Sequence, residues 1–425
     1  MAHRALPVRP DLEQLKHQAK DLLREIRAGD PAALADLSAF HPDRPDPARV
    51  KLADAQLVLA RSYEASSWAR LVHACRLIDA IWRDDRGTVR ELIERHPNLL
   101  HEHATIRDSN WGAPMSYAAN LGRNEIIRLL HGLGARDHAH AIDRAALQGQ
   151  TDTVRMLYKM AGEPALPDDA LGGTAYTLNV SGTALMLELG ARLRDEAGRS
   201  LAPIAVVLET DSRKPRAKHE ILELYVRHGV ELPDTACMAL HRGRIDLLEE
   251  HLRRDPGLLQ RTFAHEEIYP PELGCHDEVL ATQGTPLKGT TLLHMCVDYD
   301  ELEIARWLLE KGMEVDVPGE VDADGFGGHT ALFCTVVSQP NFWMNYNRLA
   351  PSAAFAELLL GHGANPNAVA SLRKQLHPGY GPVHDVERVY EYRDVTPLGW
   401  GEGFHAKVFV SEPAMRLIAE HGGRA

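Results

Sequence analysis

Short apolar stripes at helical spacing recur along the chain. The segment "TLLHMCVDYDELEIARWLLEKGMEVD" (291–316) carries two sets of apolar residues spaced i, i+3, i+4: Leu293, Cys296 and Val297, then Ile304, Trp307 and Leu308. Each set forms one face of a short amphipathic helix, and Gly312 follows as a helix stop. Because two short helices cannot bury both stripes alone, the pattern predicts neighbouring copies of the same unit.

Two further segments have this layout, "APMSYAANLGRNEIIRLLHGLGARD" (113–137) and "HAIDRAALQGQTDTVRMLYKMAG" (140–162). The unit resembles the ankyrin repeat, a β-turn followed by two antiparallel helices over about 33 residues. The Thr-Leu-Leu-His at 291–294 is similar to that family's Thr-Pro-Leu-His opening. The resemblance implies an all-α solenoid of paired antiparallel helices, with nine units beginning near residues 77, 110, 138, 172, 200, 235, 289, 328 and 394.

The first 75 residues do not follow the repeat. "DLEQLKHQAKDLLREI" (11–26) and "SSWARLVHACRLI" each place apolar residues on one helical face. The stretch resembles the helical leader that precedes repeats in some bacterial ankyrin proteins, which implies a bacterial source and a cap for the first repeat. The expected domains are a helical N-terminal cap (1–75), repeats with short connections (76–260) and repeats with long finger insertions (261–425).

Composition excludes some classes of function. The net charge of -13 argues against nucleic acid as a partner. The densest basic stretch, "RKPRAK" (213–218), is predicted to be a solvated loop. The start of the chain has no apolar signal core, and no segment has 18 consecutive apolar residues, so we expect no membrane association. The five scattered cysteines lack CxxC spacing and fit a reducing cytoplasm.

Three insertions interrupt the later units, each directly before a repeat opening: residues 261–290, 317–329 and 368–395. Such positions extend the finger turns of an ankyrin stack, so the three insertions should be neighbours. They contain apolar anchors that a disordered loop would not need: Phe263, Tyr269, Phe326, Tyr380, Tyr390 and Tyr392. We therefore expect a partly enclosed site on the C-terminal concave face. Two other interruptions, at 210–219 and 338–352, fall between paired helices and should lie at the opposite end.

The insertions also concentrate residues that bind ligands or transfer protons. The candidate binding residues are His265, Glu266, Glu267, Tyr269, His276, Asp324, His329, Arg373, Tyr380, Tyr392, Arg393 and Trp400. No HExxH or CxxC motif is present, so we expect neither a metal nor a cofactor. "DADGF" (322–326) begins like a calcium loop but lacks the glutamate that such a loop needs at its twelfth position. His294 and His241 are interpreted as structural.

Two functions remain open. The first is a module that recognises a protein partner through the elaborated fingers, which is what the ankyrin resemblance implies. The second is an enzyme, or a binder of a small ligand or metal at the C-terminal concave face, built from the histidine, acid and arginine residues of the insertions.

Overall fold

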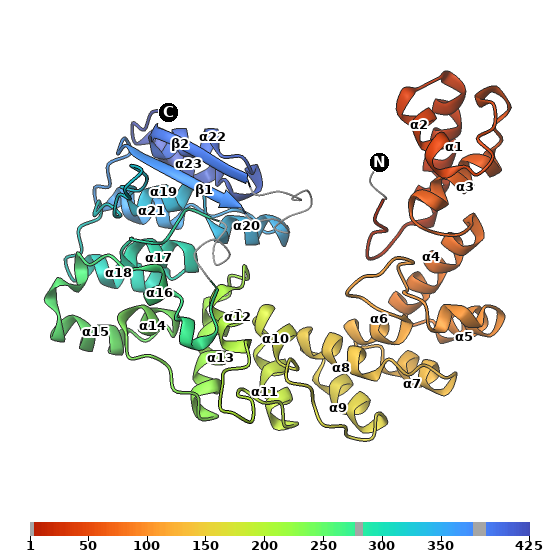
Figure 1. The fold of residues 1–425 in the computed structure, drawn as a ribbon, viewed down its shortest axis with the longest axis horizontal. Coiled ribbons are helices and arrows are strands. Elements are labelled where there is room, and N and C mark those ends of the chain that lie inside the picture. The colour runs from red at the N-terminus through yellow and green to blue at the C-terminus, as the bar shows by residue number, and fades with distance from the viewer. Residues whose placement is uncertain (1–3, 277–283, 377–387) are drawn as a thin grey trace. The chain divides into compact units, whose positions relative to one another are not determined.

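The computed structural model describes residues 4–276, 284–376 and 388–425 and consists mainly of short helices (Figure 1). The chain divides into two compact units, one ending at Ala165 and the other beginning at Leu166. This division differs from the predicted boundaries at 75 and 260, which remain predictions.

All the regular secondary-structure elements in the described part of the first unit are helices. Its elements are α1 (Leu12–Ala28), α2 (Pro31–Phe40), η1 (Pro47–Arg49), α3 (Leu52–Ser62), α4 (Trp68–Trp82), α5 (Arg86–Arg95), η2 (Pro97–Leu100), α6 (Pro114–Asn120), α7 (Asn124–Gly132), α8 (His138–Leu147) and α9 (Thr151–Met160). Asp11 caps the N-terminus of α1, and Gly29 ends that helix in the left-handed conformation. A core formed by α1–α4 buries Leu22, Leu59 and Leu71. Beyond it, α4 contacts α5, α6 contacts α7 and α8, and α8 contacts α9.

The second unit contains the elements α10 (Gly172–Tyr176), α11 (Val180–Glu188), α12 (Pro203–Glu209), α13 (Pro215–Arg227), α14 (Ala236–His241), α15 (Ile245–Arg254), η3 (Pro256–Leu259), α16 (His265–Ile268), η4 (Pro271–Leu273), α17 (Leu292–Tyr299), α18 (Leu302–Glu310), α19 (Ala331–Val336), α20 (Gln339–Tyr346), α21 (Ala354–Gly361), β1 (Ala370–Leu376), β2 (Arg388–Val395), α22 (Pro397–Gly403), η5 (Lys407–Phe409) and α23 (Glu412–Glu420). The helices α14, α17, α19 and α22 contact one another in sequence, and each also contacts the second helix of its own pair. This is the stacking of repeated helix pairs that the apolar stripes require.

Buried histidines connect consecutive turns of this stack. His294 receives a hydrogen bond at Nδ1 from the Thr291 hydroxyl (2.9 Å), and its Nε2–H donates to the backbone carbonyl of His329 (3.0 Å). His241 similarly donates from Nε2 to the carbonyl of Ile268 (2.9 Å). The predicted structural roles of His294 and His241 are confirmed.

The prediction of an all-α fold is wrong in the third insertion. β1 and β2 form a two-stranded antiparallel sheet with a bulge between Ala370 and Leu372. The strands come from opposite ends of one long insertion, so neither has a nearby partner that the local pattern would reveal. In Figure 1 the pair lies beside α22 and α23 near the C-terminus.

The prediction of a solvated basic loop at 213–218 is also wrong. Arg213 is buried and pairs with buried Asp298 (Nη2 to Oδ2, 3.0 Å), while buried Lys218 lies 3.3 Å from the Glu301 carboxylate. Both cations face the ring of Tyr299, at 5.0 and 4.1 Å from its centroid. Helix α13 begins at Pro215, so Lys218 falls on the helix face that packs inward with Ile221, Leu222 and Tyr225. The other predicted interruption, 338–352, contains the helix α20.

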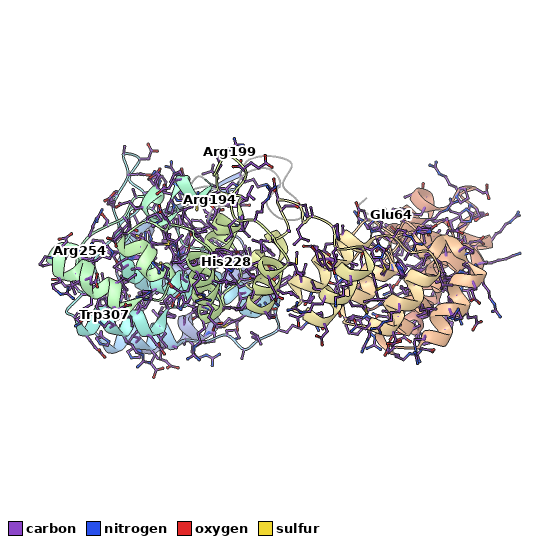
Figure 2. The ribbon with its side chains drawn as sticks, turned by 90° about the horizontal axis from the view of Figure 1, so that it is seen from below. Glu64, Arg194, Arg199, His228, Arg254 and Trp307 are labelled. Atoms are coloured by element: carbon purple, nitrogen blue, oxygen red, sulfur yellow. The ribbon has the colours of Figure 1, made fainter. Side chains whose placement is uncertain are left out.

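The described surface of the second unit carries charged groups at its edges (Figure 2). Arg199 projects from a short turn closed by the bridge between Arg194 and Ser200, while Trp307 lies toward the opposite edge. None of the helices in the described residues is both long and apolar enough to cross a lipid bilayer.

Candidate functional site

The three insertions are joined by backbone contacts. The first is closed at its base by an antiparallel bridge between Phe263 and Thr290. The amide of Glu320, in the second insertion, donates to the carbonyl of Gly289 in the first (2.7 Å). The Glu320 carboxylate also accepts a hydrogen bond from the Thr262 hydroxyl. The first two insertions therefore form one layer.

The second insertion folds into a tight hairpin and joins the third. Val321 and Gly327 form the closing bridge, and the Asp322 carboxylate accepts hydrogen bonds from the amides of Asp324 and Phe326 (2.9 Å each). The backbone hydrogen bond from Phe326 is the main cause of the lowered pKa of Asp322. The amide of Gly327 donates to the carbonyl of Ser371 at the start of β1 (2.6 Å).

Side chains reinforce the contact between the hairpin of the second insertion and β1. Arg373 on β1 donates to the carboxylates of Asp322 and Asp324, each at 3.0 Å. The ring of Phe326 lies under two guanidinium groups, with Arg373 at 4.8 Å and Arg393 at 4.2 Å from the ring centroid. These ion pairs and cation–π contacts fix the hairpin against the sheet.

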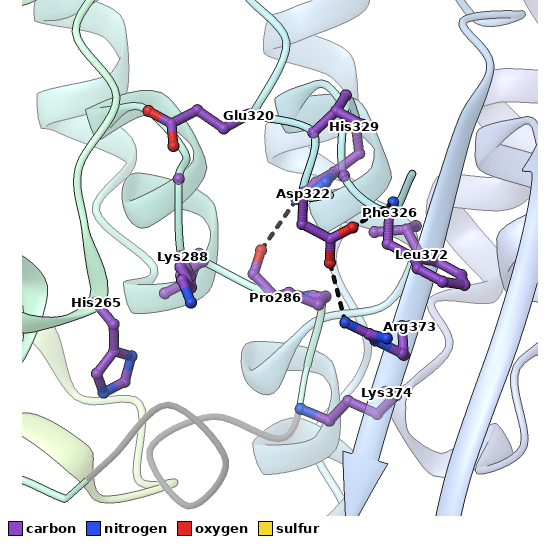
Figure 3. A pocket seen from close by; sticks show the side chains of 14 residues that line it. His265, Pro286, Lys288, Glu320, Asp322, Phe326, His329, Leu372, Arg373 and Lys374 are labelled. Atoms are coloured by element: carbon purple, nitrogen blue, oxygen red, sulfur yellow. Dashed lines mark hydrogen bonds and ion pairs between the residues drawn. The ribbon is translucent and has the colours of Figure 1, made fainter. Parts of the chain in front are cut away.

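A pocket of about 260 Å³ opens where the insertions meet. All three contribute to its lining, which consists of His265, Pro286, Leu287, Lys288, Gly289, Glu320, Val321, Asp322, Phe326, Gly327, His329, Leu372, Arg373 and Lys374. In Figure 3, Glu320 and Asp322 lie on one side, and the Lys374 side chain extends from β1 toward the side where His265 and Lys288 lie. The pocket therefore combines apolar walls with acids and cations.

Two groups in the lining are strongly affected by burial. Burial lowers the pKa of His329 to about 4, so its ring is neutral at pH 7. Its Nε2–H donates to the carbonyl of Pro286 (3.0 Å), which leaves Nδ1 as a buried acceptor without a hydrogen-bond partner. Burial likewise lowers the pKa of Lys374 to about 8, although the negative charge of Asp298 opposes this shift.

The predicted binding residues occupy different environments. His265, His329 and Arg373 line the pocket. Glu266, His276, Asp324 and Arg393 are exposed around the insertions, and His276 donates from Nδ1 to the Glu209 carboxylate (2.6 Å). Tyr380 lies outside the described residues.

Four predicted residues make hydrogen bonds or ion pairs with other parts of the protein. Tyr269 is buried with its hydroxyl 2.5 Å from that of Tyr299, and Trp400 is buried with its indole N–H donating to Thr285 (3.1 Å). Neither side chain is available to a partner as a surface anchor, because each fills the core. Glu267 caps α16 and pairs with Arg261, and the Tyr392 hydroxyl accepts a hydrogen bond from the amide of His405 (3.1 Å).

Sequence reasoning did not select every residue that forms the pocket. Lys288, Glu320, Asp322 and Lys374 were not among the selected binding residues, although all four lie in or beside the insertions. Lys374 shares the buried face of β1 with Leu372, but the strand that places it there was not predicted from the sequence. Within the described residues, no group of three or more histidine, cysteine, aspartate or glutamate side chains is arranged to hold a metal ion.

Comparison with known proteins bears on the helix pair α17–α18 beside this pocket. Residues 288–320 match the ankyrin repeat. The matched segment begins at Lys288 in the pocket lining, contains Thr291–His294 and ends at Glu320, also in the lining. The pocket lining thus includes both ends of the segment that is similar to an ankyrin repeat.

Similarity beyond this repeat is weak. The crystal structure of the human ASB11 ankyrin repeat domain aligns with 74% of this chain and 99% of its own, at 15% identity and a TM-score of 0.27. A comparison with curated proteins finds no match. The predicted bacterial source and N-terminal leader remain predictions.

Proposed function

We propose that the second unit recognises a protein partner through the outer surface of the joined insertions. This insertion surface is defined by Val321, Asp324, Val389, Glu391 and Arg393, all of which are exposed. The observation that supports the proposal most is the set of backbone hydrogen bonds through Gly289 and Gly327, which hold three separate insertions as one layer. A surface held in one conformation loses less conformational entropy when a partner binds.

The composition of the surface fits this role. Val321 and Val389 are 61% and 50% exposed, although valines on a hairpin or strand are usually packed against something. Asp324, Glu391 and Arg393 add exposed charges of both signs to the same surface, and protein interfaces combine apolar and polar residues in this way. The segment that matches the ankyrin repeat, residues 288–320, connects the first two insertions, and stacked repeats create extended binding surfaces. The proposal is a soluble, non-catalytic contact with a folded or extended polypeptide.

The test uses the full-length chain as bait in a lysate of the organism that encodes it, followed by titration of the purified partner. Val321→Asp combined with Val389→Asp should weaken that partner's affinity at least about tenfold, because two apolar contacts are each exchanged for a charge. Val408→Asp is the matched control, since Val408 is 51% exposed but lies on η5 outside the insertion surface. Unchanged affinity in the double variant, or equal loss in the control, would contradict the proposal.

The alternative of a small-ligand site in the insertions is favoured by one observation, the pocket of about 260 Å³ with buried polar side chains in its lining. The small-ligand site would lie inside the layer formed by the insertions, whereas the protein partner would bind the outer surface of that layer. Both functions can therefore coexist in one protein.

A further inference from the structure

Lys374 is a buried amine beside an open space. Its residue is only 5% exposed, yet its side chain contributes to the lining of the pocket between the insertions. A lysine is seldom buried to this extent without a specific role, because desolvation of its ammonium group is costly. Its position on β1 directs it to the same space as His265 and Lys288 (Figure 3).

Lys218 provides an internal comparison. It is 3% exposed and its Nζ lies 3.3 Å from the Glu301 carboxylate and 4.1 Å from the Tyr299 ring centroid. The hollow that Lys218 borders has a volume of about 0 Å³, so it offers no space for a ligand in this structure. Both lysines are therefore buried, but only Lys374 of the two lines a cavity that has space for a ligand.

We propose that Lys374 is a nucleophilic lysine whose ε-amine condenses with the carbonyl group of a small aldehyde or 2-oxo acid held in this pocket. The neutral amine attacks the carbonyl carbon to form a carbinolamine, and loss of one water then gives an imine and breaks the carbon–oxygen bond. No oxidant or reductant is needed. The inference rests on the small-ligand alternative and is independent of partner binding at the insertion surface.

The lining supplies the other groups that this reaction requires. His265, on the side toward which the Lys374 side chain extends, can carry the proton that must reach the departing hydroxyl. Lys288 places a cation in the same lining, and an ammonium group has three N–H donors, so it can hold a carboxylate together with other acceptors. Leu287, Phe326 and Leu372 provide apolar contact for the remainder of a small molecule. These features favour a carbonyl compound that carries a carboxylate.

Burial also places the amine in its reactive form near neutral pH. With a pKa of about 8, roughly a quarter of the Lys374 side chains are neutral at pH 7.5, against roughly a thousandth for an ordinary lysine. The described charged groups that face the amine or share its pocket are Asp298 on α17, His265 on α16, Lys288, Glu320, Asp322 and Arg373. Of these groups, Asp298 raises the pKa of Lys374, and desolvation by burial outweighs it, so the amine is less basic than a solvated one.

The experiment treats the full-length protein with glyoxylate and sodium cyanoborohydride at pH 7.5 and maps alkylated lysines by peptide mass spectrometry. Cyanoborohydride transfers hydride to the imine carbon and fixes the adduct as a secondary amine. Lys374 should be alkylated at least about tenfold faster than Lys218 and faster than each exposed lysine. Alkylation of Lys374 no faster than that of Lys218 would overturn the proposal, and this comparison needs no variant that could misfold.

Two variants separate the reaction from simple exposure. Lys374→Arg should abolish the fast-reacting site while leaving the thermal unfolding midpoint close to that of the wild type. Lys288→Ala should slow alkylation by glyoxylate several-fold but leave alkylation by acetaldehyde, which lacks a carboxylate, unchanged. Equal slowing with both aldehydes would show that Lys288 does not hold the carboxylate and would remove that part of the proposal. Loss of partner binding in the Val321/Val389 variant would have no bearing on either result.

Discussion

At the residue scale, neutral histidines hold the base of the insertions together. His294 donates to the carbonyl of His329, and His329 in turn donates to the carbonyl of Pro286. Each bond requires the proton on Nε2, and among the described residues no carboxylate forms a hydrogen bond with either ring to stabilise a second proton. Burial therefore lowers the pKa of His294 to about 3 and that of His329 to about 4. The folded protein binds these protons less readily than the unfolded chain.

This linkage predicts acid sensitivity of the second unit. In the unfolded chain a histidine has a pKa near 6.5, so between about pH 6.5 and 4 the unfolded state binds more protons and stability falls as the pH falls. For His329 alone the loss is on the order of 3 kcal/mol. Urea unfolding should therefore show a smaller difference in stability between pH 7.5 and 4.5 for His329→Gln than for the wild type. An identical difference in the two proteins would show that His329 is accessible to protons in the folded state.

The two histidines also show what a sequence can reveal at this scale. His294 was predicted to be structural because the Thr-Leu-Leu-His opening fixes its register in a known turn. His329 was selected as a binding residue because it lies in the second insertion with acidic residues such as Asp324. His329 lines the pocket and also donates a structural hydrogen bond to the carbonyl of Pro286. Both roles arise only when the first and second insertions fold against each other.

At the element scale, the hairpin of the second insertion determines whether the layer forms. Gly325 and Gly327 both adopt positive φ, at 83° and 122°. A β-carbon on Gly325 would have no neighbour within 4 Å, whereas one on Gly327 would lie 1.8 Å from the carbonyl oxygen of Glu320. The same residue, Gly327, donates the hydrogen bond to Ser371 that joins the hairpin to β1.

This difference gives a matched pair of variants. Gly325→Ala should cost about 1 kcal/mol for the left-handed conformation alone. Gly327→Ala adds a collision with backbone that cannot move without opening the hairpin, so it should cost more than about 2 kcal/mol. Amide hydrogen exchange should show faster exchange in residues 317–329 and β1 only for Gly327→Ala. Similar exchange in both variants would mean that the hairpin is not tightly packed against the sheet.

The elements themselves were predictable to different degrees. The helix pairs from 113 to 160 and from 291 to 310 follow from apolar spacing, because each helix makes its own backbone hydrogen bonds. The strands β1 and β2 were missed because a strand is completed only by its partner, here separated by residues outside the described part of the chain. For the pocket, the sequence predicted only that the three insertions lie close together and enclose a site. Its actual lining depends on side-chain directions, such as the inward turn of Lys374, which spacing alone did not provide.

At the scale of the whole molecule, burial of charge distinguishes the second unit from a plain stack of helices. Arg213, Lys218, Asp298 and Glu301 are all buried, and they connect α13 and the segment before it with α17 and the start of α18. A solvated loop was expected at 213–218 because composition alone favours exposure for such residues. The acidic partners that make burial favourable lie far away in the sequence, and Arg213 and Asp298 are 85 positions apart. Long-range pairing of this kind specifies how layers stack and cannot be read from a local pattern.

The division into two compact units predicts that they lose structure separately. Leu59 is buried in the α1–α4 core, and Leu59→Ala should destabilise that core by about 2–5 kcal/mol through lost packing and a cavity. Because contacts in stacked repeats extend mainly to nearest neighbours, hydrogen exchange should accelerate in α1–α3 while β1, β2 and the 321–327 hairpin keep their wild-type rates. Acceleration throughout both units would instead show that the chain unfolds as a single cooperative block. Unchanged exchange in the insertions would also mean that the insertion surface and the Lys374 pocket do not depend on the N-terminal helices for their stability.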